Sequence, residues 1–362
     1  MKSSGYSHAS IPIEARRHEL VTGLERGLQF ECDAGDARPA IIGCSGGADS
    51  VALVCGCLVL RHRQAPVIGD FIVAHVHHHL RGDDADAEAD SVRTLCERFE
   101  VPFCQLDIHP ETLSGNLASN ARRLRYDALA AVARDHDCPR VLVAHHADDQ
   151  AETILMAMAR GAGLDGLGGM RWRRSLDNDI DLCRPMLRVR RATIESFCRS
   201  AGVTWCEDPT NQSPTSRRAI MRHEVLARLE ELWPGTIERL VQQADLIDVA
   251  NDALSEDLDA AFGDASVHAW SRDVHRAASI ARSAAALVRS ARALMPTVMN
   301  DLTSARVREV VYAIRDDDRS PRYFRWPGLT VDVTAREVLL KPGAPEAHLN
   351  DASPERDALD KD

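Results

Sequence analysis

The sequence predicts an α/β fold with a doubly wound, Rossmann-like parallel sheet, followed by a smaller, mostly helical C-terminal domain. Over roughly the first two hundred residues, short apolar runs alternate with longer segments in which apolar residues recur with the helical period. This alternation is typical of βαβ crossovers, which place helices on both faces of a parallel sheet. From about Trp233 the chain changes to alanine-rich, acidic helical segments and a short β-like stretch at 329–340.

Four strands and four helices account for the alternation. The strands are expected at 41–44, 71–76, 103–108 and 141–144, and the helices at 50–60, 84–99, 117–136 and 148–160. Ligands of such sheets bind where the strands end, so the residues that follow each strand are the first candidates for a functional site. The glycine-rich stretch at 161–169 interrupts the pattern and is expected to be a mobile loop.

We expect four parts in the 362-residue chain: an N-terminal extension and helix at 1–36, a catalytic domain at 37–232, a helical and β domain for the substrate at 233–343, and an acidic, solvated tail at 344–362. The N-terminus lacks a continuous apolar segment behind its positive charge, and no stretch approaches the length of a membrane span. We therefore expect a cytoplasmic protein without membrane contact. The oligomeric state stays open, with a homodimer as one alternative.

Composition argues against several classes of function. No lysine occurs between Lys2 and Lys341, which excludes a Walker A loop and a Schiff-base mechanism in that span. The ten cysteines include no C-x-x-C pair, and several lie in apolar runs, so we interpret them as reduced core thiols. A net charge of −11 argues against indiscriminate polyanion binding. Thirteen arginines against eight acidic residues at 160–228 nevertheless allow a local basic face.

The stretch IIGCSGGADSVAL, at 41–53, sets two adjacent glycines directly after the first strand. Gly46 and Gly47 allow a sharp turn in which successive backbone N–H groups point at one anion, at the N-terminus of the following helix. Ser45 and Ser50 add hydroxyl groups, and Asp49 could hold a magnesium ion between phosphate oxygens. The loop therefore predicts a phosphate site; an ordinary Gly-Gly turn with a capping side chain is the alternative.

Four histidines crowd the end of the second strand, in the stretch HVHHH at 75–79. Imidazole is a common transition-metal ligand, so a metal site has to be considered. The sequence shows no carboxylate ligand on the same face as these histidines. It therefore disfavours a metal site at this point.

Two pairs of charged residues have spacings that place each pair on one face of a helix. Arg122 and Arg125, at i and i+3, could meet phosphate or a developing negative charge. Asp149 and Glu152 follow the fourth strand, so both carboxylates face the ligand edge of the sheet and together could hold an ammonium group. A solvated arginine pair and carboxylates that only cap their helix are the alternatives.

The ordered motifs resemble those of the tRNA(Ile)-lysidine synthetases, which are ATP pyrophosphatases with a PP-loop. The loop S-G-G-x-D-S at 45–50 is similar to their pyrophosphate loop, and GNLASNARRLRYDAL at 115–129 and AHHADDQAETILMAMARGAGLDGLGGM at 144–170 resemble their next motifs. Further matches are RPML, VTWCEDPTN and RRAIMRHEVL, so the resemblance covers 41–232. The chain departs from the family pattern at His77, His79, Ala118 and Ala219, where the family has Asn, Gly, Glu and Asn.

This resemblance implies an ATP- and Mg²⁺-dependent ligase. It would join free L-lysine to C2 of the first anticodon cytidine of an isoleucine tRNA with a CAU anticodon, through an adenylated cytidine, and so change codon reading from AUG to AUA. The implied ATP-binding residues are Ser45, Gly46, Gly47, Ala48, Asp49 and Ser50, with Asp49 as the metal ligand.

The resemblance also implies that Asp149 and Glu152 bind lysine. Because an ammonium group is not a nucleophile, a second group has to accept its proton, and a carboxylate or His146 is expected to do so. The expected catalytic residues are Asp49, Arg125, His146, Asp149 and Glu152. The arginines expected to contact tRNA are Arg122, Arg188, Arg190, Arg191, Arg218 and Arg222.

Three other functions stay open. A tRNA thiolase could use the same loop, but such enzymes commonly use paired cysteines, and the chain has no C-x-x-C. An amidotransferase or ligase for a small metabolite should bring a glutaminase module, for which no segment fits. A noncatalytic nucleotide- or RNA-binding module is conceivable because of the four departures from the family pattern.

Overall fold

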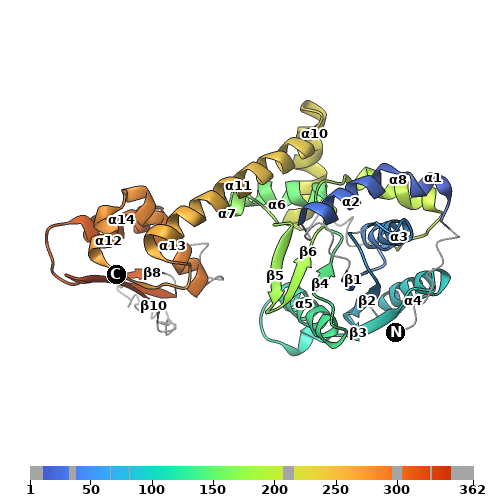
Figure 1. The fold of residues 1–362 in the computed structure, drawn as a ribbon, viewed down its shortest axis with the longest axis horizontal. Helices are drawn as coiled ribbons and strands as arrows, with labels where there is room; N and C mark the ends of the chain where they lie inside the picture. Colours follow the sequence, from blue (N-terminus) through green and yellow to red (C-terminus); the bar gives the residue numbers. More distant parts are fainter. Residues whose placement is uncertain are drawn as a thin grey trace, which may run out of the picture. The chain divides into compact units, whose positions relative to one another are not determined.

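The computed structural model describes residues 11–31, 38–65, 67–80, 82–206, 216–295, 304–326 and 328–343 (Figure 1). The chain divides into two compact units, Met1–Asp248 and Val249–Asp362. The tail expected at 344–362 lies outside the described residues. Within those residues, none of the helices combines the length and the apolar character that a membrane crossing requires.

The first unit is built on a six-stranded sheet with the order β3-β2-β1-β4-β6-β5. Its strands are β1 (Ala40–Gly43), β2 (Phe71–His77), β3 (Phe103–Asp107), β4 (Arg140–Leu142), β5 (Arg173–Asp177) and β6 (Ile180–Cys183). Neighbouring strands run parallel, except that β5 pairs antiparallel with β6. The four expected strands are present with ends shifted by at most two residues, and the mostly parallel sheet confirms the predicted fold class.

The sequence does not predict the hairpin of β5 and β6. The sequence of β5 is Arg-Arg-Ser-Leu-Asp, and its first three residues are exposed. An edge strand of this kind has neither an apolar run nor an alternation of apolar and polar residues, which are the usual signals of a strand. Its arginines indicated a basic surface instead.

Helices cover both faces of this sheet (Figure 1). On one face, α2, α3 and α8 pack over a core that includes Ile42 and Val73; on the other, α5 packs over Ile41 and Ala74. Adjacent residues of β1 therefore point into the cores on opposite faces of the sheet, as in a strand that is buried on both sides.

The helices of the first unit are α1 (Ile13–Arg16), α2 (Glu19–Glu31), α3 (Ala48–His62), α4 (Asp83–Arg98), α5 (Leu117–Asp135), α6 (Ala147–Ala159), α7 (Leu164–Leu167), α8 (Arg191–Ala201), α9 (Arg217–Ile220), α10 (Ala227–Leu232) and the first part of α11 (Thr236–Phe262). The unit also has a short 3₁₀ turn at Pro110–Thr112 and a π-helical segment at Met221–Leu226.

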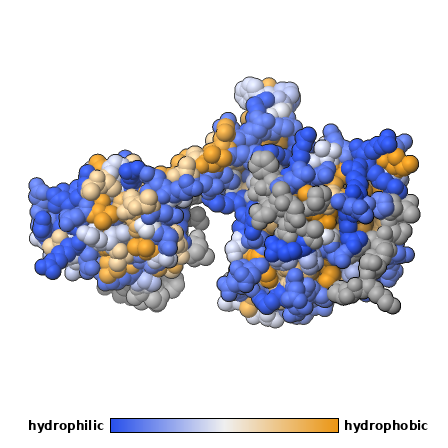
Figure 2. All heavy atoms as spheres, viewed as in Figure 1, coloured by the Kyte–Doolittle hydropathy of each residue, from blue (hydrophilic) through white to orange (hydrophobic). Residues whose placement is uncertain are grey.

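The long helix α11 contributes to both units. Its first turns pack Ile237 and Val241 against α6, whereas Leu258 and Phe262 belong to the core of the second unit. The sequence placed the domain boundary at 232/233, just before this helix, but the two units divide within it, between Asp248 and Val249. Figure 2 shows a mostly hydrophilic surface with hydrophobic side chains along α11, in keeping with the high exposure of Leu246 and Val249.

The second unit combines helices with a four-stranded antiparallel sheet of order β7-β10-β9-β8. The β-like stretch expected at 329–340 forms the hairpin of β9 and β10. The helices pack on this sheet around residues such as Val310, Ile314 and Val331. The elements are β7 (Ala269–Ser271), α12 (Arg272–Ala277), α13 (Ile280–Leu294), α14 (Ser304–Arg315), β8 (Arg322–Trp326), β9 (Leu329–Val333) and β10 (Glu337–Pro342).

Candidate active site

The glycine loop forms the predicted turn between β1 and α3. Gly46 has a φ of +89°, a conformation that glycine adopts at little cost. Ser50 is buried: its Oγ accepts a hydrogen bond from the Ser45 N–H at 3.1 Å and donates to the Gly47 carbonyl at 3.0 Å. The buried Ser50 hydroxyl therefore stabilises the conformation of the loop through these two hydrogen bonds.

The open end of this loop has groups that can bind an anion and a cation together. Gly47 is the N-cap residue of α3 and brings no capping side chain, so the first N–H groups of this helix stay open for an anion. Asp49 lies in the first turn, and its Oδ1 is buried without a hydrogen bond. A buried carboxylate oxygen of this kind suits a hard cation such as Mg²⁺.

A pocket of about 200 Å³ opens at the carboxyl ends of β1, β2 and β4, where the fold class places ligand sites. Its lining includes Ser45, Asp49, Ser50, Arg125 and His145. A second pocket of about 450 Å³ has Arg122 and His77 in its lining and shares Arg125 and His78 with the first. Arg125 therefore lines both pockets, and in the first pocket it lies in the same lining as the phosphate loop.

Positive charge gathers around Tyr126 on α5. The guanidinium carbons of Arg122, Arg125 and Arg174 lie 5.1 to 5.2 Å from the centre of its ring. Burial raises the pKa of Tyr126, but these arginines and Arg184 outweigh it and leave that pKa below its usual value. The wall next to the first pocket thus favours negatively charged ligands.

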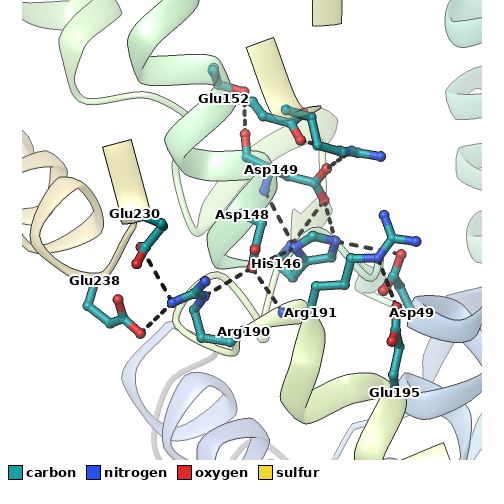
Figure 3. Close-up of polar contacts among 12 residues, drawn as sticks. Asp49, His146, Asp148, Asp149, Glu152, Arg190, Arg191, Glu195, Glu230 and Glu238 are labelled. Atoms are coloured by element: carbon teal, nitrogen blue, oxygen red, sulfur yellow. Dashed lines mark hydrogen bonds and ion pairs between the residues drawn. The ribbon is translucent and has the colours of Figure 1, made fainter. Parts of the chain in front are cut away.

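His146 joins the phosphate loop to the predicted carboxylate pair (Figure 3). It is buried, and its Nε2 lies 3.6 Å from Asp49 Oδ2 and 3.4 Å from Asp149 Oδ2. It also begins α6: in the neutral form of the ring its Nδ1 accepts a hydrogen bond from the Asp149 N–H at 3.4 Å, and Asp149 Oδ2 accepts one from the His146 backbone N–H at 3.2 Å in either form. One side chain therefore sets the distance between Asp49 and Asp149.

Three nearby carboxyl groups influence the charge of His146. Burial lowers its pKa, but the carboxylates of Asp49, Asp149 and Asp148 outweigh burial and raise that pKa above the usual 6.5. For Asp49, burial raises the pKa, whereas the hydrogen bond and charge of His146 dominate and lower it. His146 already carries its proton over a wider pH range than usual, so it is better suited to hold the carboxylates than to accept a proton.

We expect the contribution of His146 to stability to depend on pH. Because its folded pKa is raised, the stabilisation is complete below about pH 6.5 and is lost as the pH rises through the folded pKa. His146→Asn removes the titration and keeps a good N-cap residue. In urea unfolding, the stability gap between wild type and variant should be larger at pH 6 than at pH 8; an equal or larger gap at pH 8 would contradict the assignment.

The predicted pair Asp149 and Glu152 lies together and holds two arginines. Glu152 is completely buried; its Oε2 accepts a hydrogen bond from Arg218 Nε at 2.6 Å, and its Oε1 accepts one from Arg222 Nε at 2.5 Å. Asp149 Oδ1 accepts from Arg218 at 3.0 Å. The carboxylates expected to bind an ammonium group thus bind cations here, and two arginines expected to contact tRNA provide them.

Arg188, Arg190 and Arg191, three of the other arginines assigned to tRNA, make ion pairs within the first unit. Arg188 pairs with Asp245 at 2.6 Å. Arg190 pairs with Glu238 at 2.7 Å and with Asp148 at 3.4 Å (Figure 3). Arg191 Nε lies 3.1 Å from Glu195. A phosphate would have to compete with these carboxylates, so the assignment to tRNA stays a prediction.

Sequence reasoning did not assign His145, although it lines the first pocket. Burial lowers its pKa well below 6.5, and the charges of Arg184, Arg122 and Arg125 lower it further. His145 is therefore neutral at pH 7 and can donate or accept a hydrogen bond without carrying charge. The two adjacent histidines of the motif AHHADD were the signal in the sequence that a histidine could line the pocket. Which of the two side chains faces the pocket depends on the residue at which β4 ends, and the sequence does not define that residue.

Comparisons with known proteins show the family to which the chain is similar. Residues 22–229 match the family model described as PP-loop domain. A tRNA(Ile)-lysidine synthase from Rhodopirellula baltica is 34% identical over 260 residues, covering 67% of this chain and 66% of the relative. One from Synechococcus sp. is 34% identical over 246 residues, covering 68% of this chain and 71% of the relative.

The comparisons also show differences in length and a more distant fold relative. The chain spans 66%, 49% and 44% of the length of three curated relatives that it matches. Among solved structures, the U34-tRNA thiolase NcsA from Methanococcus maripaludis superposes with a TM-score of 0.53 at 17% identity, over 64% of this chain and 79% of that chain. At this identity, the likeness supports the fold alone.

Proposed function

Because this chain belongs to the tRNA(Ile)-lysidine synthase family of PP-loop proteins, we propose that it ligates free L-lysine to the first anticodon cytidine of an isoleucine tRNA with a CAU anticodon. The product, lysidine, would change the codon that this tRNA reads from AUG to AUA. The observation that carries the proposal is the bridge of His146 between Asp49 and Asp149. This bridge supports a single site in which the loop would bind phosphate and the carboxylate pair would bind the amine.

In the first half of the proposed reaction, cytidine O2 attacks the α-phosphate of ATP, and pyrophosphate leaves. Negative charge develops on the phosphate oxygens, so the site has to present positive groups to them. The N–H groups of the loop and the guanidinium of Arg125 have this role, since both line the first pocket. Asp49 would hold Mg²⁺, which neutralises phosphate charge when it is bound.

In the second half, the lysine amine attacks C2 of the adenylated cytidine. The C2–N bond forms, the C2–O bond breaks and AMP leaves. Asp149 and Glu152 bind the incoming ammonium and place it beside C2. Because His146 already tends to be protonated, we assign the acceptance of the amine proton to the Asp149 carboxylate, with His146 as the residue that positions it.

Lysine binding requires that one guanidinium leaves the carboxylate pair. The side chain of Arg218 is 44% exposed and that of Arg222 is 21% exposed, so Arg218 is the one that withdraws. Once released, it is free to contact a tRNA phosphate. This exchange reconciles the two expectations from the sequence, namely that the carboxylates hold lysine and that the arginine contacts tRNA.

The remaining tRNA contacts are assigned to arginines with exposed or half-exposed side chains in the first unit. Arg122 is exposed on α5 at the second pocket, next to Arg125. Arg188, Arg190 and Arg191 form a group that keeps part of its surface in solvent. A tRNA substrate also accounts for the expected cytoplasmic location. The oligomeric state stays open, with a homodimer as one alternative.

Transfer of labelled lysine tests the proposed function. The chain is incubated with ATP, Mg²⁺ and radiolabelled lysine, and with either a CAU-anticodon isoleucine tRNA or a methionine tRNA with the same anticodon. We expect ATP-dependent label in the isoleucine tRNA and none in the methionine tRNA. Label in neither tRNA would overturn the assignment of the substrate, and equal label in both would overturn the assignment of specificity.

A thiolase on the same fold is less well supported. Its chemistry needs a reactive thiolate or a sulfur carrier bound by cysteines. Burial raises the pKa of Cys44, the cysteine that lines the first pocket, and raises that of Cys198 to about 12. Both thiols therefore stay protonated at neutral pH, which disfavours them as nucleophiles.

A further inference from the structure

The histidine cluster at the end of β2 has a carboxylate beside it after all. Strands β2 and β3 pair in parallel with His77 directly opposite Asp107. The side chain of His79, which follows β2, reaches the same point: its Nε2 lies 2.9 Å from Asp107 Oδ1. The expectation that no carboxylate shares the face of these histidines is wrong, because the neighbouring strand and its register, which supply Asp107, cannot be read from a local motif.

The three side chains offer their ligand atoms to one point. One ligand atom each of His77, His79 and Asp107 lies within 4.8 Å of the other two. Ligand atoms of a tetrahedral zinc site lie about 3.3 Å apart, so a closure of about an ångström or two completes the set. His79 and Asp107 are 40% and 51% exposed, and the movement would change the stacking of the His79 ring on that of His109, whose centre lies 4.8 Å away.

His77 is the fixed member of the group. It is only 3% exposed, and its Nδ1 makes no hydrogen bond. Its Nε2 lies 3.1 Å from the carboxylate of Asp86 on α4, a contact that lacks the geometry of a hydrogen bond. A buried imidazole nitrogen without a hydrogen bond costs free energy. A metal bond would recover that free energy, and Asp86 is available as a further ligand.

From this arrangement we propose that His77, His79 and Asp107 form a binding site for a divalent transition-metal ion, with Zn²⁺ as its natural occupant, and with Asp86 or water at the fourth position. Two imidazoles and one carboxylate form a ligand set that suits Zn²⁺ and does not suit Mg²⁺, which prefers oxygen ligands. None of these four residues is among those assigned to the ligase chemistry, although His77 lines the second pocket, which shares Arg125 with the first. The ion would tie the edge strand β3 to β2 beside the second pocket, whose lining includes His77.

His79 offers a variant that removes a ligand without harming the fold. Its φ is +54°, in the left-handed region that favours glycine. His79→Gly therefore relieves the backbone while it removes one ligand. His136→Ala is the matched control, since His136 is an exposed histidine just after α5 and takes no part in either site.

The test is a zinc titration of the full chain after treatment with a chelator, followed by calorimetry and by thermal unfolding. We expect wild type and His136→Ala to bind one Zn²⁺ and to unfold at higher temperature with it. His79→Gly and Asp107→Asn should bind at least about 100-fold more weakly. Without metal, His79→Gly should unfold at the same or a higher temperature than wild type, and zinc should reverse that order.

Cobalt separates this site from adventitious binding at cysteines. Co²⁺ held by imidazole and carboxylate gives visible d–d bands without the near-ultraviolet charge-transfer band of thiolate ligands. We expect such bands in wild type and their loss in His79→Gly. A wild-type chain that binds no Zn²⁺ at micromolar concentration, an unchanged affinity in His79→Gly, or a thiolate band would each overturn the proposal.

Discussion

Replacing Asp49 by Asn is expected to lower the rate of ATP activation about 10²- to 10³-fold, a loss typical of removing one charge-stabilising group from an active site. The variant keeps the shape of the side chain and loses its negative charge. In the wild type, Asp49 Oδ1 is buried without a hydrogen bond, as expected for a cation ligand, and Asp49 Oδ2 faces His146. The measurement is release of pyrophosphate from ATP in the presence of the CAU-anticodon isoleucine tRNA.

Asp90→Asn provides the control for this result. Asp90 lies on α4 with a side chain that is 78% exposed, and its substitution makes the same change in net charge. We expect its rate to equal that of wild type. If Asp49→Asn released pyrophosphate as fast as Asp90→Asn, Asp49 would have no part in nucleotide activation.

Replacing Glu152 by Gln is expected to lower the free energy of unfolding by about 3 kcal/mol, the lower end of what breaking a buried ion pair costs. Glu152 is completely buried and accepts hydrogen bonds from Arg218 and Arg222. The variant leaves two guanidinium groups without the charge that neutralises them; their partial exposure to solvent limits the loss. Urea unfolding at pH 7 measures the difference.

A matched variant separates this effect from a general change in charge. Glu231 pairs with Arg228 on α10, and both side chains are more than 60% exposed. Exposed pairs of this kind contribute little, so Glu231→Gln should change the free energy of unfolding by less than about 0.5 kcal/mol. If Glu152→Gln also lowered the free energy of unfolding by less than about 0.5 kcal/mol, the Glu152 carboxylate would not be needed to neutralise Arg218 and Arg222.

Local sequence patterns predicted the parts of the fold and of the site that depend on neighbouring residues. The turn at Gly46 and Gly47, the strand before it and the helix after it lie in one short stretch, and the structure has all three. Asp149 and Glu152 share a helix face because their spacing fixes it. The sequence could not predict contacts between distant segments: the arginines on Glu152, the carboxylate beside His77 and the helix α11 shared by two units.

Those missed contacts have a common physical origin. Arg218 and Arg222 are four residues apart, a spacing that in a regular helix is equally typical of a solvated face and of a phosphate site. In the structure Arg218 lies in α9 and Arg222 in the π-helical segment that follows. Only the packing of this region on α6 selects Glu152 as their partner. The same holds for Asp107, whose position opposite His77 follows from the register of two strands.

ATP and lysine are expected to meet at one site, between the glycine loop and Asp149. A crystal structure with a nonhydrolysable ATP analogue and lysine would test this arrangement. We expect the phosphates to accept hydrogen bonds from the loop at 45–50, and the lysine amine to contact Asp149, with Arg218 moved off the carboxylate pair. Lysine bound in another crevice, or a nucleotide bound away from the loop, would show that the two substrates do not meet there.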